Sequence, residues 1–462
     1  MPPLTPVNNT FAANSARMFK LALPITVGQL AIVGMSVTDI IIAGRLSTND
    51  LAAVTLGSTV FNLSIMLVIG IILGNGPIIG RLFSAGKIAA LRNQFQNCLW
   101  LCLPLGLLCS VFIGTGIALL PRLDSPAVIT DIATSYLLPM IGSAFLLPYI
   151  MAFRTTFESM GQARTAMVFN LAGFIINIPL DYALVMGDWG LPALGGAGCG
   201  WATFFVSLFI VSGEALYARR SSTLRAYQLL DAKLPIDSQR IKETLRIGLP
   251  IGGAILAEGG FFLLIPLLVA HLGAITVSGH SVAISFDWMM FMVPMGISQA
   301  ISILVAHEMG LHRPHQAQRI CATGLGLTAV IALCQGIFVL FFRHQIAALF
   351  SPDLAVQELA AALLVYAAIF RVFDAINIGG NGALRGYKDT RITLLLASIG
   401  YWLVGFPLAY SLALTNLWGP ALGVEGFWIG IVIALALTAS LTSARVYSTA
   451  RNAVLESSAG VS

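Results

Sequence analysis

The sequence predicts an all-α polytopic membrane protein, with 12 transmembrane helices in two pseudo-symmetric six-helix bundles. Three observations support this prediction: an apolar composition, a series of apolar runs of helical length, and short motifs repeated across the two halves. Of the 462 residues, 57% are hydrophobic and only 10% are charged, whereas soluble domains carry about 25% charged residues. Such a chain cannot cover a water-facing surface, so its solvent must be a lipid bilayer.

The apolar runs define the expected helices. They lie at about 21–44, 51–76, 93–118, 127–152, 165–187, 193–217, 247–270, 277–304, 320–342, 356–382, 392–414 and 421–444. A spanning helix needs about 20 apolar residues. A membrane barrel would instead show alternating segments of about ten residues, and these runs are continuous.

The basic residues predict the orientation. With the N-terminus in the cytoplasm, 21 of the 25 Lys and Arg residues fall in cytoplasmic segments, as the positive-inside rule requires. The longest polar segment, residues 219–246, then becomes a cytoplasmic linker between an N-terminal lobe, residues 1–218, and a C-terminal lobe, residues 247–462. We therefore expect a multi-pass protein of the bacterial inner membrane with both termini in the cytoplasm.

An internal repeat relates the two halves. Ala-Leu-Pro-Ile opens the first run at residues 22–25, and Gly-Leu-Pro-Ile opens the seventh at 248–251, which is 226 residues later. Three further matches follow in chain order at offsets of 225 to 228. Because each half has an even number of spans, the repeat is parallel, and parallel halves can rock about a central cavity to give alternating access. The alternative is a duplicated scaffold without a transport role.

Ionisable residues within the apolar runs are the candidate functional residues, because a charge at bilayer depth is costly and marks a functional site by default. They are Asp39, Asp181, Glu258, Asp287, Arg371 and Asp374.

In the N-terminal half, Asn177 and Asp181 share one helix face by their i, i+4 spacing, and Pro179 between them frees a backbone carbonyl. Together with Asp39 they offer hard oxygen ligands, which suit a proton or a sodium ion. A hydrated position of Asp181 near the membrane interface is the alternative.

In the C-terminal half, Glu258 has no nearby positive charge in the sequence and is expected either to carry a proton or to make a structural hydrogen bond between helices. Arg371 and Asp374 have the i, i+3 spacing of a facing pair. They form either a static salt bridge or a site where a cationic substrate or coupling ion competes with Arg371 for Asp374. Asp287 precedes Trp288 and Met289, which are either an adaptable binding wall or ordinary span residues.

Other function classes lack their signatures. No P-loop pattern for ATP occurs, and the six cysteines fall in or beside apolar runs, as packed, reduced thiols do. We place His271 and His280 in an outer loop and His307, His312 and His315 in an inner one, without partners for a metal site. The sequence thus predicts neither an enzyme nor a nucleic-acid-binding protein, and no cofactor.

Several motifs resemble the multidrug and toxic compound extrusion (MATE) family. They are Ala-Leu-Pro-Ile at 22–25, Asp39 followed by Ile-Ala-Gly at 42–44, Asp-Leu-Ala-Ala-Val at 50–54, the glycine-rich segment 192–200, and Leu-Arg-Gly-Tyr-Lys-Asp at 384–389. The likeness runs from about residue 17 to 445. The pairing of Glu258 with Asp374 is similar to the NorM-type branch of that family.

The resemblance implies export of cationic, amphipathic drugs in exchange for sodium ions or protons, and hence antibiotic resistance. It implies ion-binding roles for Glu258 and Asp374, the residues expected to hold sodium, and for Asp39, with Asn177 and Asp181 at family positions beside it.

The chain departs from that branch at three positions. Many NorM-like members have an uncharged residue in place of Arg371, an aromatic hydroxyl in place of Phe370 and a small polar residue in place of Asp287. We therefore expect that Asp287 supplies a replacement carboxylate while Arg371 occupies Asp374.

The sequence as a whole predicts a monomeric, cation-coupled multidrug antiporter. A flippase for lipid-linked saccharides or a polysaccharide exporter of similar architecture is the alternative. That class needs several Arg and Lys residues for phosphates, whereas only Arg371 lies within a span here, against five carboxylates. A membrane-embedded enzyme or receptor is a further rival, against which stand the missing catalytic constellation and the repeat.

Overall fold

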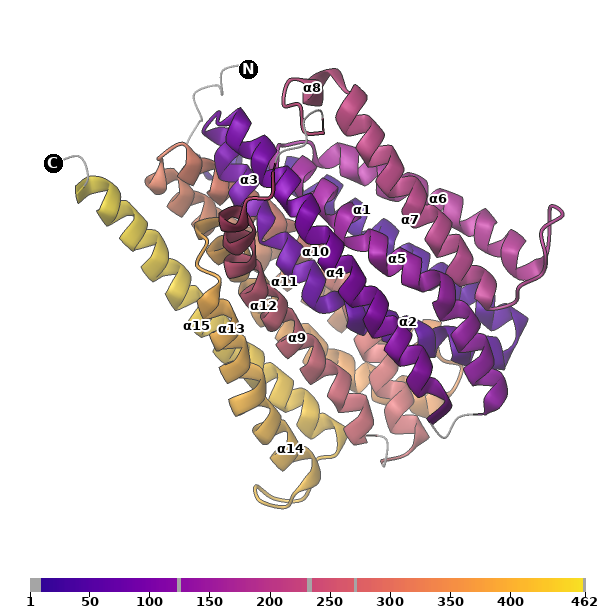
Figure 1. Ribbon diagram of the computed structural model, residues 1–462. Helices are drawn as coiled ribbons and strands as arrows, with labels where there is room; N and C mark the ends of the chain where they lie inside the picture. The colour runs from indigo at the N-terminus through magenta and orange to yellow at the C-terminus, as the bar shows by residue number, and fades with distance from the viewer. Residues whose placement is uncertain (1–9, 123–125, 231–234, 270–271, 460–462) are drawn as a thin grey trace. The chain divides into compact units, whose positions relative to one another are not determined.

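The computed structural model describes residues 10–122, 126–230, 235–269 and 272–459. These residues form helices joined by short turns, and none of them lies in a β-strand (Figure 1). Twelve helical segments are long and apolar enough to cross a membrane. The predicted all-α fold with 12 spans is confirmed.

The first six spans are α1 (Phe11–Leu46), α2 (Thr48–Leu73) continued by α3 (Asn75–Ser84), α4 (Ile88–Leu119), α5 (Ala127–Ser159), α6 (Ala163–Met186) and α7 (Ala197–Arg220). The next six are α9 (Ser238–Val269), α10 (Ala274–Gly310), α11 (Pro314–Phe350), α12 (Leu354–Tyr387), the composite of α13 (Arg391–Ala397), η3 (Ser398–Gly405) and α14 (Phe406–Leu414), and α15 (Val424–Ala459). The short elements η1 (Leu120–Arg122) and α8 (Ser222–Arg225) complete the fold.

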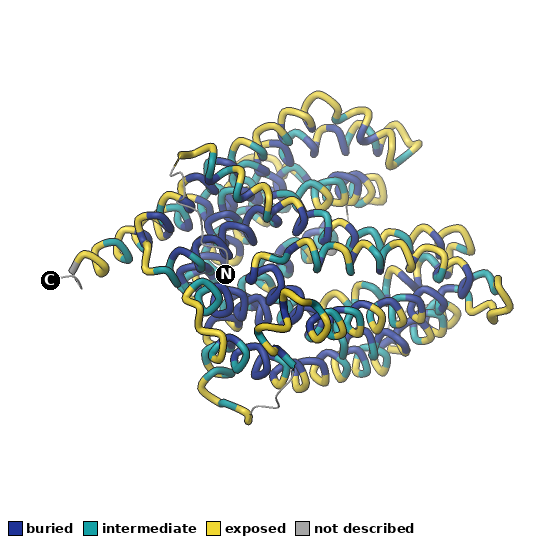
Figure 2. Tube along the Cα trace, turned by 90° about the horizontal axis from the view of Figure 1, so that it is seen from above, coloured by how far each residue is buried: buried dark blue, intermediate teal, exposed yellow. Residues whose placement is uncertain are grey.

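Several helices extend past the apolar runs that predicted them. Helix α1 begins at Phe11, about ten residues before its run, and α11 begins at Pro314. The extra turns carry polar residues, which lower the local hydropathy without opposing a helix. Most long helices have a buried face and an exposed face (Figure 2), whereas residues 150–159 of α5 and 296–306 of α10 are buried on all sides.

By its internal contacts the chain divides into two compact units. One unit is Val27–Gly252, and the other contains the described residues outside that range. These boundaries differ from the predicted lobes, because the start of α1 packs with the second half of the chain and the start of α9 packs with the first half. Met18 and Ala22 belong to a core cluster with residues of α10 and α11.

In the unit Val27–Gly252, the start of α9 packs against α2 and α4. Thr244 of α9 accepts a hydrogen bond from Gln94 of α4, at 2.9 Å. Where α2 ends, Gly74 packs so closely on α9 that a Cβ atom there would lie 2.6 Å from the Gly248 nitrogen. The predicted linker also joins this unit, since Leu224 and Leu229 are buried in one of its core clusters.

Candidate ion and substrate sites

The first site lies in the unit Val27–Gly252, between α1, α6 and α7. Asp39 is 5% exposed, and Asn177 and Asp181 have no exposed surface. A carboxylate oxygen of Asp39, one of Asp181 and the sulfur of Cys199 all lie within 4.8 Å of one another. The Thr203 hydroxyl donates a hydrogen bond to Asp39 Oδ2 at 3.3 Å. The complete burial of Asp181 disfavours its hydrated alternative.

Local sequence positions these groups. Asn177 and Asp181 are one turn apart on α6, and Cys199 and Thr203 are one turn apart on α7, so each pair occupies one helix face. Gly198 lets the helices approach, because a Cβ atom there would lie 2.7 Å from the Leu184 carbonyl carbon of α6. The two helices therefore direct their polar faces toward Asp39 of α1.

The coordination chemistry of this site is incomplete within the protein. Both carboxylate oxygens of Asp181, both polar side-chain atoms of Asn177 and Asp39 Oδ1 are buried and make no well-formed hydrogen bond among the residues described. The three side chains nevertheless lie within hydrogen-bonding reach of one another. Buried polar groups are normally hydrogen-bonded. Carboxylate, amide and hydroxyl oxygens around one point fit a proton or a small hard cation, while the Cys199 thiol is a softer neighbour.

The second site lies in the other unit and is built around Arg371 of α12. Its guanidinium forms an ion pair with the carboxylate of Asp287 and donates a hydrogen bond to the Asp287 backbone oxygen at 2.8 Å. Arg371 Nη1 also lies 3.5 Å from Asp374 Oδ2. The expected contact between Arg371 and Asp374 is present, but Asp287 is a partner of the same arginine and not a free replacement carboxylate.

Glu258 of α9 lies near Asp374. Its carboxyl group is within hydrogen-bonding reach of the Tyr401 hydroxyl and close enough to Asp374 for electrostatic interaction. Tyr401 accepts a hydrogen bond from Asn377 at 3.4 Å, and Asn377 accepts one from Thr442 at 3.1 Å. The site therefore draws side chains from α9, α12, η3 and α15.

Tyr401 reaches this position from the π-helical segment η3. π-Helical turns within α-helices are frequently found at functional sites. The widened turn also lies where Gly400 packs on Thr438 of α15. Trp288 and Met289, which were expected to form a binding wall with Asp287, are exposed, whereas the Asp287 side chain is mostly buried against Arg371.

The sequence analysis missed several members of these sites. Cys199 and Thr203 carry no charge and lie 160 residues or more from Asp39, so only the fold brings them to it. Tyr401 is an ordinary aromatic residue of an apolar run. Glu214 of α7 lies outside both sites, but it is a further buried carboxylate that was detectable, because it falls within the predicted run 193–217.

The histidine placement needs correction. His280 lies inside α10 and is 1% exposed, with its ring 5.7 Å from the Trp428 ring in an edge contact. It was expected in a loop because the apolar run before it and the run containing it lie close together. His307 and His315 lie within α10 and α11, and His271 lies outside the described residues.

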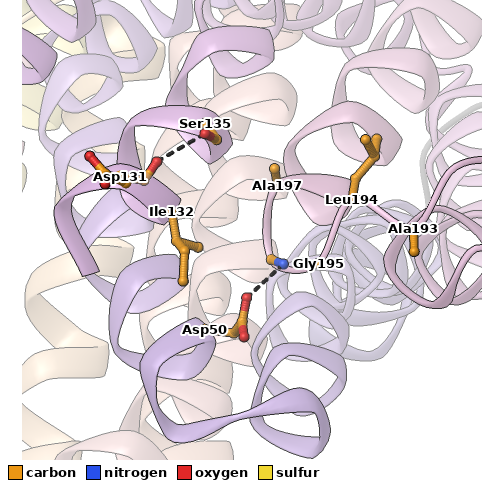
Figure 3. A pocket seen from close by; sticks show the side chains of 9 residues that line it. Asp50, Asp131, Ile132, Ser135, Ala193, Leu194, Gly195 and Ala197 are labelled. Carbon is orange, nitrogen blue, oxygen red and sulfur yellow. Dashed lines mark hydrogen bonds between the residues drawn. The ribbon is translucent and has the colours of Figure 1, made fainter. Parts of the chain in front are cut away.

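A separate pocket of about 360 Å³ lies where α2, α5 and α7 begin (Figure 3). Asp50 lines it, but this carboxylate accepts hydrogen bonds from Ser47 Oγ at 2.5 Å and from the Gly196 nitrogen at 2.8 Å. Asp50 thus fastens the loop before α7 to the start of α2. This explains why the motifs 50–54 and 192–200 occur together, and it assigns Asp50 a structural role.

Comparisons with known proteins agree with this architecture. The MatE family model matches residues 24–183 and 250–411. The multidrug resistance protein PmpM of Pseudomonas aeruginosa is 34% identical over 444 residues, covering 95% of this chain and 92% of PmpM. The multidrug resistance protein MdtK of Edwardsiella ictaluri is 33% identical over 432 residues, covering 93% of this chain and 94% of that protein.

Solved structures show the same fold. The eukaryotic MATE transporter AtDTX14 matches with a TM-score of 0.83 and 21% identity, covering 97% of this chain and 99% of that chain. The Vibrio cholerae MATE transporter VcmN in its bent form matches with a TM-score of 0.80 and 16% identity, covering 96% and 99%. Since the family consists of transporters, the chain is not an enzyme. It belongs to the MatE family, the multidrug and toxic compound extrusion transporters.

Proposed function

We propose that this chain is a cation-coupled antiporter that exports cationic, amphipathic drugs by alternating access, with sodium ions or protons as the coupling ion. The observation that supports this most directly is a buried, incompletely partnered carboxylate site: Asp39, Asn177 and Asp181 in one unit. A buried carboxylate without a partner is costly, so the site favours binding of a cation.

The second carboxylate group, Glu258 with Asp374, extends the proposal to the other unit. There, Arg371 already provides a positive charge to Asp374 at 3.5 Å. A cationic drug or a coupling ion that binds Asp374 must compete with this arginine, and Glu258 is the carboxylate that carries no such cation. We therefore assign proton or sodium binding to Glu258 first and regulation of affinity to the pair Arg371–Asp374.

The same contacts argue against a flippase for lipid-linked saccharides. A phosphate group needs an available arginine or lysine. Arg371 is engaged by two carboxylates, Asp287 and Asp374, and its charge is therefore compensated within the protein. The carboxylates outnumber the basic residues at both sites, which favours cationic cargo, as the resemblance to the NorM-type branch implies.

The test is efflux of a fluorescent cation from inverted membrane vesicles, with sodium and pH gradients imposed separately. We expect Glu258→Gln to abolish the gradient-driven part of efflux and Glu456→Gln, a matched change at an exposed carboxylate of α15, to leave it intact. Gradient-independent efflux in the unaltered protein, or full coupling in Glu258→Gln, would contradict the proposal.

We also propose an inner-membrane location with both termini in the cytoplasm, which the distribution of basic residues supports. In a Cys334→Ser background, which removes the exposed native thiol, a membrane-impermeant maleimide added to the periplasm should label Leu417→Cys in the loop after α14. It should not label Thr223→Cys on α8. Labelling of Thr223→Cys alone would reverse the topology.

A further inference from the structure

A second buried ionic cluster lies in the unit Val27–Gly252, away from Asp39. Arg154 and Glu158 are one turn apart near the end of α5, and Glu214 is on α7, which packs along α5 (Figure 1). Arg154 is 4% exposed, Glu158 is 2% exposed and Glu214 has no exposed surface. The cluster thus buries one basic and two acidic side chains.

The contacts within the cluster are unequal. Arg154 Nε lies 2.8 Å from Glu158 Oε1, and Arg154 Nη1 donates a hydrogen bond to Gln29 of α1 at 3.4 Å. Glu214 is close enough to interact electrostatically with both Arg154 and Glu158. However, neither oxygen of Glu214 has a hydrogen-bond partner within the described part of the chain. Arg154 pairs directly with Glu158, so its single positive charge cannot also balance an ionised Glu214.

The residues that flank Glu214 on α7 pack against aromatic rings. A Cβ atom at the preceding residue, Gly213, would lie 2.6 Å from the Phe169 ring, so the helices are in close contact there. The Tyr217 ring, one turn further on, has its centroid 6.1 Å from those of Phe157 and Phe169. Asn170 of α6 is 1% exposed and has both side-chain polar atoms unpartnered among the residues described. None of these aromatic and amide side chains carries a positive charge that could balance an ionised Glu214.

Apart from Arg154 and Glu158, no charged group within the described part of the chain is found to interact with Glu214. Among the helices around α7, Arg164 of α6 and Arg225 of α8 are exposed, as are Arg219 and Arg220 at the end of α7 itself. Tyr217 of α7 and Tyr149 of α5 carry no positive charge. Asp39 of α1 and Asp181 of α6 belong to the first site, which is removed from Glu214 by roughly 16 Å along α7, at 1.5 Å per residue from Thr203.

We propose that Glu214 binds a proton from the solvent and that this residue, with Arg154 and Glu158, is a second proton-binding site, distinct from the site at Asp39. The proton adds to a carboxylate oxygen of Glu214 and leaves the cluster with no net charge. Val206 and Ile210, both buried, lie between the two sites on α7 and separate them. A role of this proton in transport rests on the proposed antiport, whereas the binding itself does not.

If Glu214 binds a proton, a change at Glu158 should alter the protonation of Glu214, which is not expected of a glutamate with a structural role only. Because two carboxylates share one arginine, removing Glu158 should free Arg154 to pair with Glu214. Glu214 then ionises and releases its proton. Glu158→Gln and Glu214→Gln should therefore have the same effect on the number of protonated carboxyl groups, although they alter different residues.

The experiment is infrared difference spectroscopy of the purified full chain in detergent near neutral pH, in H₂O and in D₂O. We expect the carboxylic-acid C=O band to fall by one carboxyl group in Glu214→Gln and, equally, in Glu158→Gln. Glu308→Gln is the matched control, since Glu308 is also buried but has its own cation, Arg17, at 3.2 Å. That variant should leave the band unchanged, and Glu214→Asp should shift the band without removing it.

Two results would overturn the proposal: an unchanged band in Glu214→Gln, or a band that persists in full in Glu158→Gln. The efflux assay keeps the two proposals apart. Wild-type protein that shows the Glu214-dependent band but no cation-coupled efflux would contradict the antiport and support the proton site.

Discussion

Arg371 provides a stability test that depends on three residues and not two. It pairs with Asp287 and, at 3.5 Å, with Asp374. At an effective dielectric constant of about 20, two unit charges at that separation attract by about 5 kcal/mol, before the cost of burying them. Because either aspartate can retain the arginine, we expect each single change, Asp287→Asn or Asp374→Asn, to lower the free energy of unfolding by about 1.5 kcal/mol.

The double aspartate variant should behave differently. It leaves the Arg371 guanidinium buried with no carboxylate, and an uncompensated buried charge costs about 3–5 kcal/mol. Adding Arg371→Gln to that double variant removes the lone charge. We therefore expect the third substitution to raise stability again, by at least about 2 kcal/mol.

The measurement is reversible unfolding in mixed micelles of a non-ionic detergent and SDS, which gives a free energy for each variant. Two results would contradict the pairing of Arg371 with these aspartates. If Arg371→Gln does not stabilise the double aspartate variant, the arginine is not buried as described. If Arg371→Gln and Asp374→Asn are additive within about 0.5 kcal/mol, their side chains do not interact.

Three further outcomes are expected. Glu258→Gln should insert normally but lose coupled efflux, as measured in vesicles; wild-type coupling would make Glu258 structural. Asp39→Asn and Asp181→Asn should both impair efflux, since their carboxylates lie within 4.8 Å of each other; tolerance of either change would remove that residue from the site. Gly70→Ala, whose Cβ would overlap the backbone of Gly252, should lower the free energy of unfolding by about 1–3 kcal/mol. Gly114→Ala in α4, with nothing within 4 Å, should raise it by about 0.5–1 kcal/mol. Equal effects of the two changes would contradict the close crossing of α2 and α9.

The sequence predicts those features that depend on residues close together along the chain. Continuous apolar runs identify spans because every spanning helix needs about 20 consecutive, predominantly apolar residues. Spacing within one helix predicted that Asn177 and Asp181 share a face, and that Arg371 and Asp374 meet. These are local relations, and the geometry of a single helix determines them.

The remaining relations depend on which helices pack together. Asp287 and Arg371 are 84 residues apart, and no helical period relates them. Thr203 is 164 residues from Asp39. Glu214 lies five residues before Arg219, and its position near the end of a span does not reveal in the sequence whether it is buried. Only the packing of α7 on α5 shows that it is buried beside an arginine already paired with Glu158.

The internal repeat, by contrast, relates two contacts between distant helices. In the unit Val27–Gly252, Gly70 of α2 meets Gly252 of α9, and in the other unit Gly296 of α10 meets Thr26 of α1. Adding the offset of 226 residues found between the two Leu-Pro-Ile motifs converts position 70 into 296 and position 26 into 252. Each half of the chain therefore repeats the same crossing, between the second span of one half and the start of the first span of the other. Two helix backbones can approach this closely only where the side chains are small. The position that faces Thr26 must therefore be glycine, and in the crossing of α2 with α9 both positions, Gly70 and Gly252, are glycine. The exchange of α1 and α9 between the compact units is thus a property of the duplicated sequence itself, and it explains why boundaries drawn at the linker do not coincide with boundaries drawn by contact.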